Sequence, residues 1–361
     1  MNNCKMIIVT LFTVIIICTD SWSDEWLQKT GGATPRRLHS AVVSDDKIYI
    51  FGGTDSTNPD QSEYFRDLWE YDIINDSWSQ KVDGPAPRDC HSAVAYSGKI
   101  YVFGGFYKDI YHSNLWEYNI ADDIWSVKST QPPGRNNHMA VLYDKKMYIF
   151  GGGIRIDDKK YNFNDLWEYH ILKDKWTQKS NSPFSLESGT AVVYKNAMFV
   201  FGGSLDGETF SNRVLKYDFL TDEWSLNNIA PFSSAAHSAI VYDDKMYIFG
   251  GARSDTDQNL YLSNNIIEYD FIKNSWSGML LGDIPSRAGH ISVVHSGKMY
   301  VFGGESGVFT NGVNRVNYND LWVYKIENEP YDISGDGKTG LVESIHILKS
   351  VSGIAGAGVI H

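Results

Sequence analysis

The feature that most constrains this chain is a pattern that recurs six times along it. A pair of glycines, each time preceded by a phenylalanine, returns at intervals of 47 to 53 residues. An aromatic residue stands three positions before every pair, and a histidine stands thirteen positions before five of the six. A repeat of this length indicates one supersecondary unit per period, and such units are stable only when their neighbours stack on them. The pairs begin at Gly52, Gly104, Gly151, Gly202, Gly250 and Gly303.

Each repeat has the pattern of a four-stranded antiparallel sheet. Four short apolar or aromatic segments are separated by turn residues, and the glycine pair ends the second of them. Residues 48–51 are apolar throughout, which predicts a strand buried on both faces. A sheet with two apolar faces cannot stand alone in water, whereas six sheets around an axis bury every face. The fourth segment carries a tryptophan in the first five repeats, at Trp78, Trp125, Trp176, Trp224 and Trp276.

These landmarks resemble the kelch repeat, and the resemblance runs from Trp26 to about Ile326. It implies an all-β fold, a six-bladed kelch β-propeller, over residues 24–326. Residues 1–23 and 327–361 lie outside the repeat.

The ends of the repeat region indicate how the ring closes. The sixth repeat lacks the tryptophan of the fourth strand, and Trp26 stands at the start with no blade of its own. Trp26 precedes Arg36 by ten residues, the same offset that separates Trp78 from Arg88. We therefore expect residues 25–29 to supply the outer strand of the last blade, which closes the ring by hydrogen bonds alone.

The first 23 residues have the layout of a secretory signal peptide. Lys5 precedes an apolar stretch from Met6 to Cys18, and small residues follow, which predicts cleavage after Ser23. The predicted location is therefore extracellular or periplasmic. A retained N-terminal anchor is the alternative, while a lipoprotein attached through Cys18 is disfavoured because Ile17 precedes it.

The cysteine content limits the possible disulfides, and the net charge limits the possible partners. Only Cys90 remains after cleavage, so an intrachain disulfide is impossible and the fold depends on its core. The formal net charge is −12, which disfavours nucleic acid and anionic membranes as partners.

The C-terminal tail has the spacing of a calcium loop. Oxygen-bearing side chains occupy positions 1, 3, 5 and 12, and Gly337 occupies position 6, where such a loop turns sharply. The pattern resembles a single EF-hand loop of the dockerin type, followed by a helix from about Leu341 to Ser352. A solvated Asp-Gly turn that caps a helix is the alternative. With one loop and no entering helix, docking to a cohesin-like partner is doubtful. The predicted calcium ligands are Asp332, Ser334, Asp336, the carbonyl of Lys338, and Glu343.

An arginine precedes the repeated histidine by three positions in four repeats. A row of histidines around an axis is compatible with a metal site, but a fixed offset in every blade favours a structural role. The fourth repeat has Leu186 and Gly189 at these positions, which argues against a closed metal ring.

The loops between the second and third strands are long and contain many aromatic and polar residues. In such a blade these loops share one end of the propeller, which we call the loop face, and long loops on a rigid scaffold commonly carry function. The candidate ligand-binding residues are Tyr64, Arg88, Tyr107, Arg135, Tyr161, Tyr261, Arg287 and Phe309.

The sequence favours a secreted binding module that recognises a protein or glycan through the loop face. The alternative is a carbohydrate-active enzyme, because secreted kelch propellers include a sialic acid epimerase (mutarotase). That chemistry needs an acid–base pair near the axis, which Glu208 or Glu187 with an arginine would supply. A copper site of the galactose-oxidase kind is disfavoured because Cys90 lies within the repeat signature. A structural spacer anchored through the tail is a third possibility.

Overall fold

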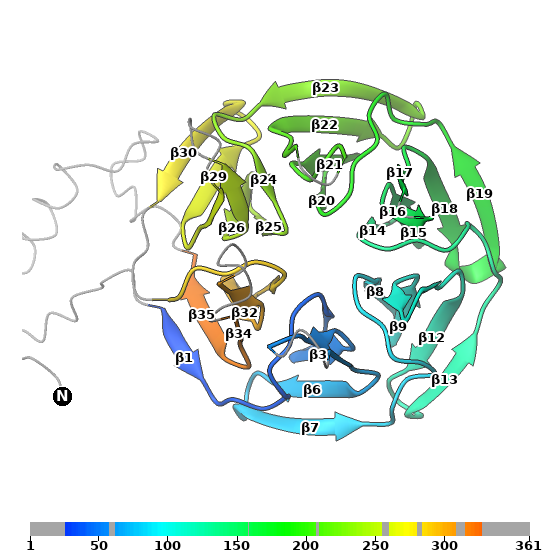
Figure 1. The fold of residues 1–361 in the computed structure, drawn as a ribbon, viewed down its shortest axis with the longest axis vertical. Helices are drawn as coiled ribbons and strands as arrows, with labels where there is room; N and C mark the ends of the chain where they lie inside the picture. The colour runs from blue at the N-terminus through cyan, green and yellow to red at the C-terminus, as the bar shows by residue number, and fades with distance from the viewer. Residues whose placement is uncertain are drawn as a thin grey trace, which may run out of the picture.

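The structure is a computed structural model that describes residues 26–57, 62–157, 159–206, 209–254, 260–279, 284–307 and 315–326. These residues form six four-stranded antiparallel sheets that stand as blades around a central axis (Figure 1). The predicted all-β propeller is confirmed. Several predictions fall outside the described residues: the signal peptide 1–23, Glu208, Phe309, the tail 327–361 and its ligands Asp332, Ser334, Asp336, Lys338 and Glu343.

Each blade runs from an inner strand beside the axis to an outer strand at the rim (Figure 1). We number the blades 1 to 6 by their inner strands. The inner strands are β2 (Ser40–Ser44), β8 (Ser92–Tyr96), β14 (Met139–Tyr143), β20 (Thr190–Tyr194), β25 (Ser238–Tyr242) and β31 (Ile291–His295). The second strands are β3 (Lys47–Phe51), β9 (Lys99–Phe103), β15 (Lys146–Phe150), β21 (Ala197–Phe201), β26 (Lys245–Phe249) and β32 (Lys298–Phe302).

The third and fourth strands complete each blade. The third strands are β6 (Leu68–Asp72), β12 (Leu115–Asn119), β18 (Leu166–His170), β22 (Arg213–Asp218), β29 (Ile266–Asp270) and β35 (Leu321–Lys325). The outer strands are β7 (Ser77–Lys81), β13 (Ile124–Val127), β19 (Lys175–Lys179), β23 (Glu223–Ile229), β30 (Ser275–Met279) and, for blade 6, β1 (Leu27–Lys29).

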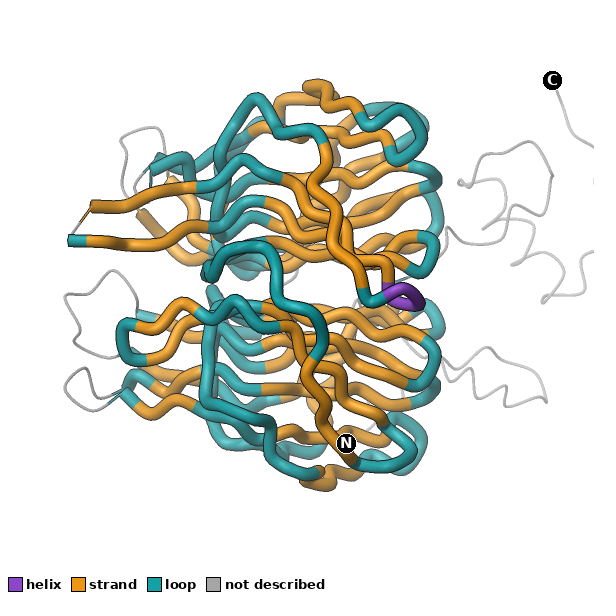
Figure 2. Tube along the Cα trace, turned by 90° about the vertical axis from the view of Figure 1, so that its right-hand side faces the viewer, coloured by secondary structure: helices purple, strands orange, loops and turns teal. Residues whose placement is uncertain are grey.

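Short hairpins project from the loop face, to the left in Figure 2. The 3-10 turn η1 (Ile171–Lys173) lies at the opposite face. In the part of the chain that the structure describes, no helix is long and apolar enough to cross a membrane. The hairpin strands are β4 (Thr54–Asp55), β5 (Glu63–Tyr64), β10 (Phe106–Tyr107), β11 (Ile110–Tyr111), β16 (Gly153–Ile156), β17 (Lys159–Asn162), β24 (Ser234–Ala235), β27 (Ala252–Ser254), β28 (Leu260–Leu262), β33 (Glu305–Ser306) and β34 (Val316–Asn317).

The N-terminal strand closes the ring as predicted. β1 pairs antiparallel with β35, and Gln28 lies opposite Trp322 (Figure 1). The indole ring of Trp26 packs 5.2 Å from the ring of Phe249 and 5.4 Å from that of Tyr324. Trp26 thus takes in blade 6 the place that the outer-strand tryptophan takes in the other blades.

The core consists of the layers between neighbouring sheets. The second strands are buried on both faces, as their apolar sequence predicts. The phenylalanine before each glycine pair contacts the tryptophan of the next blade, so the two landmarks of the repeat meet across every blade interface. The ring pairs are Phe51–Trp125, Phe103–Trp176, Phe150–Trp224, Phe201–Trp276, Phe249–Trp26 and Phe302–Trp78.

The glycine pairs lie where two backbones approach each other. Gly52 and Gly53 both have positive φ, at 62° and 94°. A Cβ on Gly52 would lie 2.7 Å from the carbonyl oxygen of Arg88 in the next blade, and one on Gly53 would lie 2.7 Å from that of Arg37. The pair is therefore required both by conformation and by the close contact between blades.

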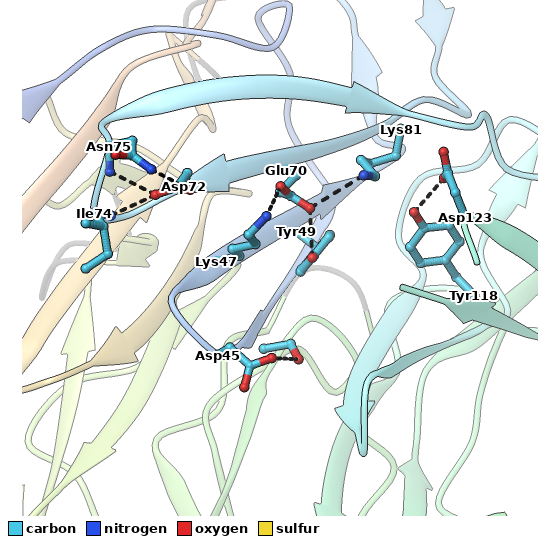
Figure 3. Close-up of polar contacts among 11 residues, drawn as sticks. Asp45, Lys47, Tyr49, Glu70, Asp72, Ile74, Asn75, Lys81, Tyr118 and Asp123 are labelled. Atoms are coloured by element: carbon cyan, nitrogen blue, oxygen red, sulfur yellow. Dashed lines mark hydrogen bonds and ion pairs between the residues drawn. The ribbon is translucent and has the colours of Figure 1, made fainter. Parts of the chain in front are cut away.

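The third-strand glutamates of blades 1, 2, 3 and 5 form ion pairs with lysines of their own blade. The buried carboxylate of Glu70 accepts hydrogen bonds from Lys47 and from the Tyr49 hydroxyl at 2.8 Å, and the Lys81 ammonium lies 3.8 Å away (Figure 3). The buried carboxylate thus has a hydrogen-bond donor or a cation beside each of its oxygens.

The tyrosine of the third strand anchors the turn that follows it. In blade 2 the Tyr118 hydroxyl donates to Asp123 at 2.6 Å (Figure 3), and the same carboxylate accepts the backbone N–H of Val82 at 3.1 Å. The Trp125 indole N–H in turn donates to the carbonyl of Val82 at 3.3 Å. The same three hydrogen bonds occur in blades 1, 3 and 4, where they hold the segment that enters the blade.

Six equivalent residues close a ring of hydrogen bonds around the axis. All six have φ between 52° and 64°, and each N–H donates to the carbonyl of the equivalent residue in the preceding blade at 2.7–3.0 Å. The left-handed conformation is costly for non-glycine residues, and the closed cycle of bonds offsets that cost. The ring consists of Leu38, Cys90, Asn137, Ser188, Ala236 and Gly289.

Candidate functional site

The hairpins of the loop face contact one another from blade to blade. The rings of Tyr64 in blade 1 and Tyr107 in blade 2 meet edge to face, with centroids 5.4 Å apart. Between blades 2 and 3 the backbone N–H of Arg155 donates to the Tyr111 hydroxyl at 2.9 Å. These contacts hold neighbouring hairpins in fixed positions, which reduces the entropy that binding would otherwise cost.

A groove of about 380 Å³ lies between the hairpins β10–β11 and β16–β17. Its walls are formed by Phe106, Asp109, Tyr111, Arg155 and Asp157. The Phe106 and Tyr111 rings lie 5.1 Å apart and form an aromatic wall. The groove therefore combines apolar surface with two carboxylates and one guanidinium, the mixture expected at a binding site.

Large apolar side chains are also exposed on the two hairpins that form the groove. Ile110 is 55% exposed, Ile156 is 51% exposed and Tyr161 is 48% exposed. Successive strand residues point to opposite faces, so Ile110 and Ile156, next to Tyr111 and Arg155, lie on the faces turned away from the groove lining.

The four predicted tyrosines lie at three different places on the loop face. Tyr64 and Tyr107 contact each other, Tyr161 lies on β17 beside the groove, and Tyr261 lies on β28 opposite Arg253. Tyr161 and Tyr261 are exposed. All four lie on loop-face hairpins, as predicted, while a role in ligand binding stays a prediction.

The three predicted arginines lie inside the blades. Arg88, Arg135 and Arg287 are fully buried. Arg135 and Arg287 each donate to a glycine carbonyl of the same blade and bind a carboxylate through both terminal nitrogens, that of Asp165 or of Asp320. Their burial places them beneath the surface of the loop face, where they brace the hairpins.

Four of the five repeated histidines bind the preceding blade by a side-chain hydrogen bond. The His91 Nε2 hydrogen-bonds the Ser40 hydroxyl of the preceding blade at 2.9 Å, and the same bond occurs at His138, His237 and His290. Burial, and then a nearby arginine, lowers the pKa of His138 to about 3, so the ring is neutral at physiological pH. The structural interpretation of these histidines is therefore correct. Within the described ranges, no three His, Cys, Asp or Glu side chains are placed to hold a metal ion.

Charged side chains surround the mouth of the axis on the loop face. Arg37 forms an ion pair with Glu305 at 2.6 Å, and Lys160 pairs with Glu187, which the sequence named as a candidate acid. Asp89 is buried, and its Oδ1 has no hydrogen-bond partner in the described part of the chain. Burial raises the pKa of Asp89 to about 6, against the opposing effect of Arg37 and of the Cys90 thiol.

Sequence reasoning named Glu187 near the axis but missed the other charged residues of the mouth and the groove. The position after the repeated arginine, or after its replacement in blades 4 and 5, holds Arg37, Asp89, Asn136, Glu187, Ala235 and Ala288 in blades 1 to 6. This position and the one that follows it both change from blade to blade, so no constant landmark marked the mouth. The groove had no signal either, because its loops differ in length and sequence between repeats.

Comparison with known proteins places the chain among kelch-repeat propellers. The profile described as the Attractin/LZTR1 beta-propeller matches residues 124–333, and the KLHDC2/KLHL20/DRC7 Kelch-repeats domain matches residues 8–187. The chain is 29% identical over 313 residues to the leucine-zipper-like transcriptional regulator 1 homolog of Drosophila melanogaster. That match covers 82% of this chain but 26% of the fly protein, so the chain spans about a quarter of that relative.

Further similarities are local or structural. Host cell factor 2 of Homo sapiens is 35% identical over 82 residues, which is 20% of this chain and 10% of that protein. The solved structure of YjhT superimposes with a TM-score of 0.70 at 17% identity, covering 82% of this chain and 97% of YjhT. YjhT therefore supports the fold. Because the first profile spans more than half of the 361 residues, the chain belongs to the Attractin/LZTR1 β-propeller family of kelch-repeat proteins.

Proposed function

We propose that this chain is a binding module that holds a segment of a partner protein in the groove between blades 2 and 3. The observation that carries the proposal is the groove itself, a preformed cavity of about 380 Å³ with an aromatic wall of Phe106 and Tyr111. Kelch propellers are commonly protein-binding scaffolds, which agrees with this geometry.

The chemistry of the groove indicates the kind of segment it accepts. The aromatic wall of Phe106 and Tyr111 suits an apolar anchor. Asp109 and Asp157 outnumber Arg155, so a basic side chain beside the anchor would be attracted. The partner segment is therefore expected to combine a large apolar residue with a lysine or arginine.

Peptide display tests this proposal directly. A random-peptide library selected on the wild-type propeller should enrich sequences with an apolar anchor next to a basic residue. The same peptides should fail to bind Phe106→Asp, which removes part of the aromatic wall, and should bind Ile272→Asp, an apolar-to-aspartate change in a turn of the opposite face, where Ile272 is 64% exposed. Enrichment that does not distinguish the two variants would reject the groove.

A glycan array run with the same variants tests the remaining class of ligand. If a glycan binds the wild type but not Phe106→Asp, and no peptide is enriched, the ligand of the groove is a sugar rather than a protein segment.

A second candidate function is acid–base catalysis at the axial mouth, of the sialic acid mutarotase kind. The observation that favours it is Asp89, because a buried carboxyl with a pKa of about 6 is suited to accept and return a proton near neutral pH. Mutarotation of sialic acid, followed by optical rotation, should be accelerated by the wild type and not by Asp89→Asn. If neither the wild type nor Asp89→Asn accelerates mutarotation above the uncatalysed rate, this candidate function is rejected.

We also propose that residues 1–23 direct secretion and are removed after Ser23. The support is the charged start, the apolar middle and the small residues at the cleavage point. Intact-mass measurement of the exported protein should give an N-terminus at Asp24.

We propose that the tail loop from Asp332 to Glu343 binds calcium. Its spacing of oxygen ligands supports this role. Calorimetric titration should show calcium uptake by the wild type and none by Asp336→Ala, and equal uptake by both would reject the site.

A further inference from the structure

Three blades contain the same buried ion pair. A fully buried arginine donates through both terminal nitrogens to an aspartate at the start of the third strand, at 2.6–2.9 Å. A tryptophan two residues after the aspartate donates its indole N–H to the same carboxylate at 2.6–2.7 Å. The guanidinium also lies 4.4–4.5 Å from the centre of an aromatic ring. The three sets are Arg36, Asp67, Trp69 and Phe65; Arg135, Asp165, Trp167 and Phe163; and Arg287, Asp320, Trp322 and Tyr318.

Blade 2 has the arginine but not the carboxylate. Arg88 is as deeply buried as its counterparts, and its Nη1 donates to the carbonyl of Gly104 at 2.9 Å, as theirs do. The position of the aspartate is held by Asn114, and the position of the aromatic ring by His112. The site therefore keeps the positive charge and lacks its negative partner.

The loss of the carboxylate leaves several buried polar atoms without partners. Within the described residues, Arg88 Nη2, Trp116 Nε1, Asn114 Oδ1 and His112 Nε2 make no hydrogen bond. The first two are the atoms that bind the aspartate in the other blades. An unpaired buried charge with unsatisfied donors is strongly unfavourable, so native sites of this kind are normally completed by a further group.

We propose that a small monovalent anion occupies this position beside Arg88, either chloride or a carboxylate the size of formate or acetate. Arg88 Nη2 and the Trp116 indole N–H would bind it, as their counterparts bind the aspartate oxygens. Burial lowers the pKa of His112 to about 4, so the site carries a single positive charge at neutral pH and matches a single negative one. The full burial of Arg88 excludes a large ligand, while half-buried His112 and Asn114 separate the site from solvent.

The substitution Asn114→Asp tests the proposal, because it restores the carboxylate that the other blades contain. The wild-type melting temperature should rise by about 2 °C for each tenfold increase in free anion above its dissociation constant. Chloride, formate and acetate are titrated separately at constant ionic strength, balanced with gluconate, whose anion is too bulky to enter. The anion that gives the steepest rise identifies the ligand. Asn114→Asp should lose this dependence.

Blade 3 supplies the matched control. Asp165→Asn removes the carboxylate beside Arg135 and should create in blade 3 the anion dependence that the wild type shows in blade 2. Equal salt dependence of the wild type and Asn114→Asp would overturn the proposal.

A bromide-soaked crystal gives a reading that does not depend on stability. An anomalous peak within hydrogen-bonding range of Arg88 Nη2 in the wild type, absent in Asn114→Asp, is the expected result. A wild-type crystal with no peak at Arg88 would also overturn the proposal.

Discussion

At the scale of single residues, four of the five repeated histidines keep a hydroxyl partner across the blade interface, whereas His39 faces a blade with Ile291 at that position. The repeated histidine bonds a hydroxyl at the start of the preceding blade's inner strand, as His91 does with Ser40. In the blade 3–4 interface both partners are replaced together, since Met139 stands where the hydroxyl would be and Gly189 where the histidine would be. The thioether of Met139 fills the space that the imidazole leaves.

This pairing predicts that the two positions are energetically coupled. Gly189→His alone should destabilise the protein by roughly 2 kcal/mol, because the new Cβ would lie 3.1 Å from the Met139 sulfur. Adding Met139→Ser should recover about half of that loss, by removing the clash and supplying the hydroxyl. Urea unfolding of both single variants and the double variant measures the coupling. Strictly additive effects would show that the pair is not a unit.

Because the Asp89 carboxyl is buried, we expect the free energy of unfolding to depend on pH. Burial raises its folded pKa to about 6 from the ordinary 3.8, so its contribution to stability is fully present below pH 3.8 and is lost as the pH rises through 6. Above that range the ionised carboxylate costs the folded state roughly 3 kcal/mol. Asp89→Asn should therefore be more stable than the wild type at pH 8, and this advantage should shrink towards zero near pH 4. A constant difference at both pH values would contradict the assignment.

At the scale of elements, the strands that recur at constant offsets could be predicted from the sequence. The ion pairs and the hairpins in the loops between them could not. The main strands and the closing strand β1 followed from landmarks at constant offsets. The ion pairs of the arginines were missed because Asp67, Asp165 and Asp320 lie 31, 30 and 33 residues beyond their arginines, across loops of different length. The hairpins β10–β11 and β16–β17 lie in those same loops, so no offset could have revealed the groove that they form.

Because β1 closes the ring, we expect residues 24–30 to be needed for the stability of all six blades. Trp26→Ala should lower the free energy of unfolding by about 3–5 kcal/mol, because it removes the contacts with Phe249 and Tyr324. Deletion of residues 24–30 should unfold all blades in one transition. Leu27→Ala is the control, since Leu27 is 58% exposed and should cost less than 1 kcal/mol. A separate, partial transition in the deletion variant, monitored by calorimetry, would show that blade 6 melts alone.

At the scale of the whole molecule, closure of the ring makes one rigid scaffold from six sheets that would each be unstable alone. Each sheet buries its faces only against its neighbours, the axial hydrogen bonds form a closed cycle, and the final sheet is completed by the start of the chain. The rigid ring holds the hairpins of one face at fixed distances, so the groove of blades 2 and 3 exists before any partner arrives.

The most direct test of this account is the affinity of a display-selected peptide, measured by calorimetry for the wild type, Phe106→Asp and Ile272→Asp. The account predicts a dissociation constant at least tenfold higher for Phe106→Asp, equivalent to about 1.4 kcal/mol, and an unchanged value for Ile272→Asp. Equal affinity for all three proteins would contradict the claim that the loop-face groove is the binding site.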